Sequence, residues 1–276
     1  MYNKDAWKKY LPDHLDEVMD FCEDYKKFLS ASKTERLAVN ESVKLCEMKG
    51  FKPLSSFKKL VKGDKVYVVN KNKNIAVFVI GEKKVEEGLH VLGAHIDSPR
   101  MDLKQNPLYQ KNDICYLDTH YYGGIKKYQW VTIPLALHGV VCKKDGTSVV
   151  INIGEDENDP VLGITDLLIH LSGDQMQKNA ARVIEGEDLD VTVGSLPLNG
   201  EEKDAVKANV LRLLKEKYDI EEEDFVSAEI EVVPAGKARD FGLDRSMVAG
   251  YGHDDRVCAY TSLRAILDVE PSEYTS

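Results

Sequence analysis

Long apolar runs and an excess of basic residues are both missing from this sequence. No apolar run approaches the roughly 18 residues of a membrane-spanning helix, and residues 1–10 are polar, unlike a secretory leader. The 47 Asp and Glu outnumber the 37 Lys and Arg, giving a net charge of −10, whereas nucleic-acid binding needs a basic patch. We therefore expect a cytoplasmic protein that binds neither membranes nor nucleic acids.

Paired cysteines are absent as well. The five cysteines are odd in number, scattered and never spaced as Cys-x-x-Cys, at Cys22, Cys46, Cys115, Cys142 and Cys258. This usage is typical of reduced, mostly buried thiols in a cytoplasmic protein, and it argues against zinc binding through cysteine. The 276 residues are 43% hydrophobic and 30% charged, which fits a soluble globular protein with a full core.

The N-terminal part predicts helices followed by a hairpin. Residues 5–50 place apolar side chains at helical spacing, and the stripe Leu15, Met19 and Cys22 is expected to be core. Residues 32–35 can start a second helix, and Gly50 can end it. Two β-branched runs then flank a turn rich in Asn and Lys, at residues 65–70 and 75–80.

A further apolar run, residues 89–94, leads into His95-Ile96-Asp97. We expect this run to be a buried strand, and ligands in α/β sheets lie beyond the carboxyl ends of strands. His95 can give one nitrogen to a metal there. Asp97 returns to the same side of an extended segment and can bind the other nitrogen, which fixes the tautomer. The alternative is a buried structural His bonded to a nearby carboxylate.

The middle of the chain is rich in strand patterns. Asp145-Gly146 predicts a tight hairpin turn. Strands are expected at residues 114–117, 131–135, 139–142, 148–153 and 225–233, and helices at 165–171 and 205–218. We interpret residues 102–235 as an inserted β-rich domain, and residues 1–101 with 236–276 as an α/β catalytic domain.

A second motif, Gly252-His253-Asp254-Asp255-Arg256, precedes a helical pattern. The Asp pair is therefore expected at a helix N-terminus, where Asp255 can simply cap the first turn. Asp254 is freer to face a cation. A bridging carboxylate can hold two zinc ions close together, so His95 and Asp254 are candidates for a terminal and a bridging ligand. Such a site activates water and polarises an amide carbonyl.

Four motifs together resemble the aspartyl aminopeptidase family of zinc metallopeptidases, at residues 93–100, 133–139, 166–171 and 250–257. The resemblance implies two Zn²⁺ ions, with His95 as a ligand, Asp254 as the bridge and Asp97 as the catalytic residue that orients His95. It implies that an acidic or neutral N-terminal residue is removed from a peptide substrate. It also implies a homo-oligomer formed through the inserted domain.

His170 is the candidate for a substrate-binding residue that reaches a neighbouring subunit's active site. This role is also implied by the resemblance alone, and a structural His is the alternative. The fold class is then an α/β zinc-aminopeptidase-like catalytic domain, incomplete at its C-terminal end, with an inserted β-rich dimerisation domain.

One departure from the family pattern bears on activity. The family places its general base in a Glu-Glu pair after the bridging Asp, and residues 255–276 contain no such pair. Glu86-Glu87 and residues 221–223 lie in the wrong part of the chain. We therefore expect residues 1–276 to bind zinc weakly and not to cleave peptides, because the base and further ligands are missing.

Two other functions fit parts of the same pattern. The chain can be a non-catalytic assembly module or pseudo-peptidase. The missing Glu-Glu pair favours this function, and the two metal-binding motifs argue against it. Metal content separates this function from the peptidase, because an assembly module needs no zinc. A related zinc hydrolase such as a deacylase is the second alternative, and the context of residues 250–256 together with the large insertion favours an aminopeptidase instead.

Overall fold

The computed structural model describes residues 5–276, so part of the polar N-terminal segment predicted over residues 1–10 lies outside the described residues. The chain forms two compact units. Unit 1 contains residues 1–98 and 237–276, and unit 2 contains residues 99–236. Among the described residues, no helix is both long enough and apolar enough to cross a membrane.

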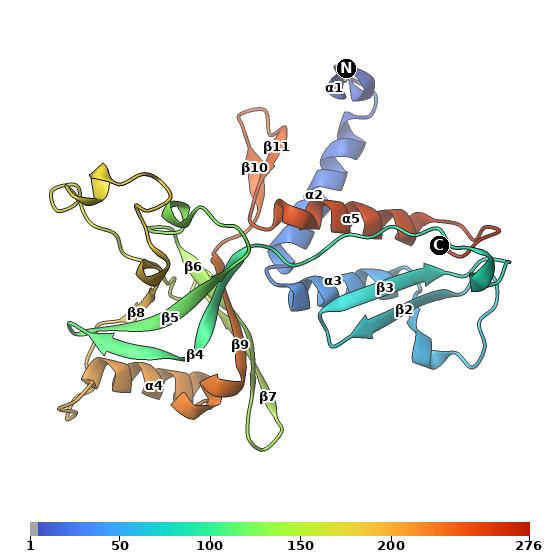
Figure 1. Ribbon diagram of the computed structural model, residues 1–276. Helices are drawn as coiled ribbons and strands as arrows, with labels where there is room; N and C mark the ends of the chain where they lie inside the picture. Colours follow the sequence, from blue (N-terminus) through green and yellow to red (C-terminus); the bar gives the residue numbers. More distant parts are fainter. Residues whose placement is uncertain (1–4) are drawn as a thin grey trace. The chain divides into compact units, whose positions relative to one another are not determined.

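Unit 1 combines helices with a small sheet (Figure 1). Its helices are α1 (Trp7–Tyr10), α2 (Leu15–Ala31), α3 (Glu35–Met48) and α5 (His253–Asp268), with short 3-10 turns η1 (Leu54–Ser56) and η2 (Val85–Glu87). Its strands are β1 (Lys52–Pro53), β2 (Lys65–Asn70), β3 (Asn74–Val79), β10 (Arg239–Phe241) and β11 (Met247–Ala249). The main sheet has the order β1-β2-β3, and β10 pairs separately with β11.

The local signals near the N-terminus are confirmed. The Thr34 hydroxyl accepts a hydrogen bond from the Leu37 N–H, at 3.3 Å, and so caps α3. Gly50 follows the end of α3 with a φ of +84°, a conformation that glycine adopts without strain. The antiparallel β2–β3 hairpin lies where the two β-branched runs predicted it.

The core of unit 1 forms where α2, α3 and α5 meet the main sheet. The Tyr260 ring packs against Tyr25 and Phe28 in tilted arrangements, with ring centroids 5.2 Å and 5.1 Å apart. The prediction that Leu15, Met19 and Cys22 of α2 belong to the core is wrong, because Leu15 is exposed and the other two are only half-buried. The reason is that α2 buries only its C-terminal half, from Tyr25 to Leu29.

The strand predicted over residues 89–94 is also wrong. These residues are irregular, with a single bridge between Leu89 and Thr275, and Val91 and Leu92 are exposed. A strand needs a ladder of backbone partners, and one bridge does not supply it. Instead, residues 89–94 and Ile96 line an open apolar groove of about 680 Å³ together with β3 and α5.

Unit 2 is an antiparallel six-stranded sheet with one long helix (Figure 1). Its strands are β4 (Arg100–Lys111), β5 (Ile114–Tyr122), β6 (Leu135–Cys142), β7 (Ser148–Ile153), β8 (Val191–Gly194) and β9 (Ala228–Pro234), in the spatial order β7-β6-β9-β4-β5-β8. Helix α4 (Ala205–Tyr218) packs on β4, β5 and β8. The 3-10 turns are η3 (Lys127–Gln129), η4 (Gln175–Gln177), η5 (Gly186–Asp188) and η6 (Glu222–Ser227).

Unit 2 confirms some predicted elements and corrects others. The β6–β7 hairpin turns at Asp145-Gly146, and α4 covers the predicted helix. Residues 131–134 form a turn before β6, and η6 occupies the start of the strand predicted over residues 225–233. Residues 165–171 are not helical, because so short a segment gains too few backbone hydrogen bonds to offset helix nucleation.

The five cysteines are all free thiols. Cys46 and Cys115 are buried and Cys22 is half-buried, but Cys142 and Cys258 are exposed. The prediction that the cysteines are mostly buried holds for two of the five.

Candidate metal centre

His95 is held by Asp97, the residue predicted to fix its tautomer. Its Nδ1 lies 3.0 Å from the Asp97 carbonyl oxygen and 3.3 Å from Asp97 Oδ1. A carbonyl oxygen only accepts hydrogen bonds, so Nδ1 carries the proton and donates. The other ring nitrogen, Nε2, is thereby left with a lone pair for a cation. The alternative of a buried structural His is wrong, because the His95 side chain is 53% exposed.

Asp254, from the C-terminal segment of unit 1, lies close to His95. Its Oδ1 lies 3.3 Å from His95 Nε2 although the two residues are far apart in the sequence. The Asp254 backbone is extended, with φ −91° and ψ 107°, so this residue stands outside the regular turns of α5. Its side chain is 75% exposed. The Asp255 Oδ2 atom is 3.8 Å from the same nitrogen.

The spacing of these two atoms fits a shared zinc ion. Zn²⁺ binds histidine nitrogen and carboxylate oxygen at about 2.0–2.2 Å in tetrahedral geometry, which places two such ligand atoms about 3.3–3.5 Å apart. The separation of Nε2 and Oδ1 lies in this range. An imidazole nitrogen beside a carboxylate is also the donor set that zinc prefers.

The charges around His95 favour a cation. Partial desolvation lowers the pKa of the imidazole, but the hydrogen bond to the Asp97 carbonyl and the charges of Asp97 and Asp255 outweigh it. The pKa of His95 therefore lies above its ordinary value. The same negative field that stabilises the imidazolium would attract a divalent cation, which competes with the proton for Nε2.

Asp255 does not cap the helix as the alternative interpretation expected. Gly252 occupies the N-cap position of α5, and no side chain caps it. The Asp255 carboxylate instead lies beside the Cys258 thiol, and its hydrogen-bonding interaction and negative charge raise the pKa of that thiol. Asp255 therefore remains at the edge of the candidate metal centre, beside His95.

His253 is turned away from the candidate ligands. Its Nε2 lies 3.2 Å from the Val248 carbonyl oxygen, and its Nδ1 lies 2.9 Å from the Tyr25 hydroxyl. The carbonyl requires a donor, so Nε2 carries the proton and Tyr25 donates to Nδ1. Both ring nitrogens of His253 are thus engaged in hydrogen bonds that fix the segment before Asp254.

His170 lies in unit 2, in the irregular segment after residue 164, and it is exposed. Its predicted role toward a neighbouring subunit stays a prediction. The apolar residues around it are also exposed, namely Leu167, Leu168, Ile169 and Leu171.

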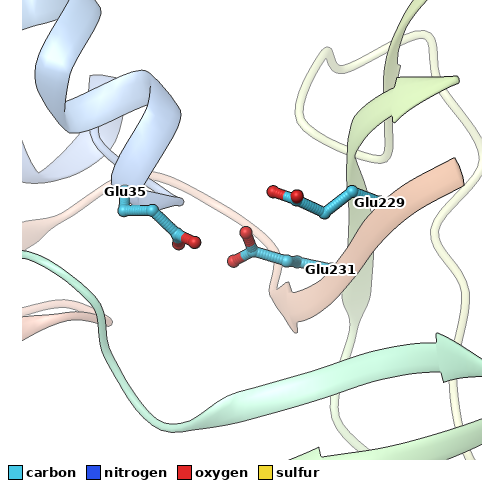
Figure 2. Close-up of side chains that lie close together, drawn as sticks. All are labelled: Glu35, Glu229 and Glu231. Carbon is cyan, nitrogen blue, oxygen red and sulfur yellow. The ribbon is translucent and has the colours of Figure 1, made fainter. Parts of the chain in front are cut away.

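Three glutamates outside the sequence-derived site are labelled in Figure 2. Glu35 starts α3, and its carboxylate pairs with Lys73 Nζ at 3.3 Å. Glu231 lies on β9 and pairs with Arg100 Nε at 3.0 Å. Glu229 is two residues earlier on the same strand and so shares its face with Glu231. Glu35 and Glu231 are therefore accounted for as ion-paired carboxylates.

Comparison with known proteins decides the family. The model of the family described as "Aminopeptidase I zinc metalloprotease (M18)" matches residues 28–276. The chain belongs to the M18 family. The resemblance predicted from four motifs is thereby confirmed, and so is the assignment to a family of zinc-dependent aminopeptidases.

Relatives within M18 are similar over nearly all of this chain. The protein named "Probable M18 family aminopeptidase 1" from Clostridium acetobutylicum is 55% identical over 277 residues, which is 99% of this chain and 60% of that protein. A crystal structure of an M18 aminopeptidase from Thermotoga maritima matches with a TM-score of 0.93 at 46% identity, over 100% of this chain and 60% of that chain. The structure of aminopeptidase I from Clostridium acetobutylicum matches with a TM-score of 0.90 at 52% identity, over 100% of this chain and 62% of that one.

The M18 chain described here spans about 60% of the length of the curated relatives that it matches. The mixed α/β fold is similar to M18 structures. The family's description as zinc metalloproteases also agrees with the expected Zn²⁺.

Proposed function

We propose that this chain supplies part of the metal centre of a metal-dependent aminopeptidase. His95 Nε2 would hold zinc as a terminal ligand, Asp254 would supply the bridging carboxylate, and Asp97 would orient His95. The observation that carries the proposal is the 3.3 Å separation of His95 Nε2 and Asp254 Oδ1. The substrate is a peptide with a free N-terminus, whose first residue is acidic or neutral.

The chemistry divides between the ion and the protein. When bound, zinc supplies a Lewis acid that polarises the peptide carbonyl and lowers the pKa of a bound water. Asp97 keeps the Nδ1 proton in place through its carbonyl and carboxylate, so that Nε2 presents its lone pair. The exposed Asp254 side chain gives a carboxylate with two oxygen atoms, as a bridge requires.

The 276 residues alone are expected to bind zinc weakly and to release no product from aspartyl or leucyl anilides. The physical reason is that no Glu-Glu pair follows Asp254 within residues 255–276, so these residues lack the base that the family uses to take a proton from water. The measurement is anilide hydrolysis with added Zn²⁺ or Co²⁺. Robust turnover that disappears in Asp254→Ala would contradict this expectation.

A second proposal concerns unit 2, which we interpret as an inserted domain that joins subunits into a homo-oligomer. Support comes from Leu167, Ile169 and Leu171, which are 54%, 67% and 68% exposed. Clusters of exposed apolar side chains of this kind mark interaction surfaces. In the alternative function, a non-catalytic assembly module, this surface would be the only functional one.

Light scattering and elemental analysis test the two functions separately. We expect a particle larger than the 31.0 kDa chain, and Leu171→Asp should shift it toward the monomer because a charge would be buried at the interface. Leu213→Asp, on the exposed face of α4, is the control and should leave the particle size unchanged. An assembled particle whose zinc content does not change in Asp254→Ala would favour the assembly module, whereas a monodisperse monomer would contradict the oligomer.

A further inference from the structure

Ser98 connects the His95 segment directly to Asp254. Its hydroxyl donates a hydrogen bond to the Asp254 carbonyl oxygen at 2.6 Å, and Ser98 is only 3% exposed. The bond therefore joins the residue that follows Asp97 to the backbone of the proposed bridging ligand. The donor side of this bond is buried, which limits the access of competing water to the Ser98 hydroxyl.

Arg256 makes the reciprocal connection, from α5 back to the His95 segment. Its Nε donates to the Ile96 carbonyl oxygen at 3.1 Å, and its Nη2 donates to the Lys33 carbonyl oxygen at 3.4 Å. The side chain is 1% exposed. Gly252 makes room for the guanidinium, since a Cβ at residue 252 would lie 2.2 Å from Nη1.

We propose that Ser98 and Arg256 are positioning residues of the metal centre, and we call them the backbone clamp. The Arg256 bond attaches Ile96, the residue after His95, to α5. The Ser98 bond attaches the residue after Asp97 to Asp254. The side chains of His95 and Asp254 are themselves exposed, so their separation depends on where the backbone that carries them is held by the buried Ser98 and Arg256. The clamp sets the spacing of Nε2 and Oδ1 before any ion arrives, which lowers the cost of bringing two ligands together.

This inference rests on the proposed metal site and concerns zinc affinity rather than turnover. Replacing Ser98 with Ala removes the bond to Asp254, and the affinity of the full chain for Zn²⁺ should fall by roughly 10–100-fold, the usual effect of removing a group that orients a ligand. Zinc affinity is measured by competition with a chromophoric chelator. Ser98→Thr keeps a hydroxyl and should restore most of the affinity.

Ser42 offers a matched control within the same unit. Its hydroxyl donates to the Ala38 carbonyl oxygen at 2.7 Å, and Ser42 is 5% exposed. Ser42→Ala therefore loses the same kind of buried bond away from the candidate ligands. Thermal unfolding should shift to a similar degree in Ser42→Ala and Ser98→Ala, whereas only Ser98→Ala should lose zinc affinity.

The outcomes separate the clamp from the metal site itself. If Asp254→Ala loses zinc binding but Ser98→Ala keeps the wild-type affinity, the clamp is overturned and the metal site stands. Equal losses of affinity in Ser98→Ala and Ser42→Ala also overturn the clamp, because the effect would then be one of general stability. If Asp254→Ala binds zinc as the wild type does, the proposed metal site fails, and the clamp fails with it.

Discussion

Asp254→Ala is expected to lower the zinc affinity of this chain by at least about 100-fold, the upper end of what the loss of an orienting group costs. The substitution removes the oxygen that faces His95 Nε2 at 3.3 Å. Of the two proposed ligands only the imidazole nitrogen would remain, and a single neutral ligand does not compensate for the desolvation of Zn²⁺. Calorimetric titration with zinc measures the effect.

Asp268→Ala is the matched control for this loss of one negative charge. Asp268 lies at the other end of α5, and its carboxylate pairs with Lys49 Nζ at 2.8 Å. Zinc affinity should be unchanged in this variant, because an exposed ion pair so far along the helix does not reach the centre. Equal affinity losses in the two variants would show that net charge, rather than ligation, governs binding.

Gly139→Ala is expected to destabilise unit 2 by about 3 kcal/mol or more, at or beyond the upper end of ordinary overpacking. Gly139 lies in β6 opposite Ile230 of β9. A Cβ at residue 139 would lie 2.0 Å from the Glu229 carbonyl oxygen and 2.7 Å from the Ile230 Cα. Both are backbone atoms, so the β6–β9 pairing would have to open.

Urea unfolding followed by Trp130 fluorescence measures this effect. The chain has two tryptophans, and Trp7→Phe leaves Trp130 of unit 2 as the sole reporter. Gly124→Ala is the control, because a Cβ at residue 124 meets no atom within 4 Å. The Gly139 variant should unfold at clearly lower urea and the Gly124 variant near the wild type. Equal midpoints would contradict the close approach of the two strands.

Local signals in the sequence were sufficient for the helices and hairpins. The cap at Thr34, the stop at Gly50 and the Asp145-Gly146 turn each act within a few residues, and the structure contains all three. The same holds for the helical period of α4. The structure divides into compact units at residues 98/99 and 236/237, and the assignment of residues 102–235 as an inserted domain stays a prediction.

Features that depend on distant partners were not recognised in the same way. β4 contains Asp102, Lys104 and Gln105, so its sequence does not resemble a strand, yet pairing with β5 and β9 makes it one. Residues 89–94 show the opposite case: their apolar run predicts a strand, but they have only one bridging partner and form none. Burial on a pleated surface, not composition, decides such segments.

The candidate site shows the same division. His95, Asp97 and Asp254 could be chosen from the sequence because imidazole and carboxylate groups have a recognisable metal chemistry. Ser98 and Arg256 could not be chosen in this way, because both bind backbone carbonyl oxygens. Every residue has such an oxygen, so the sequence does not show which one accepts the hydrogen bond. Residues that neighbour one metal ligand in the sequence can therefore hydrogen-bond to the backbone of a second metal ligand, and substitutions test for such bonds.

The most direct measurement is zinc K-edge X-ray absorption on the full chain loaded with one equivalent of Zn²⁺. We expect one imidazole nitrogen and carboxylate oxygen at about 2.0–2.2 Å from the metal, with the imidazole signal lost in His95→Ala and the oxygen shell reduced in Asp254→Ala. A zinc environment that is identical in the wild type and in both variants would contradict the pairing of His95 with Asp254.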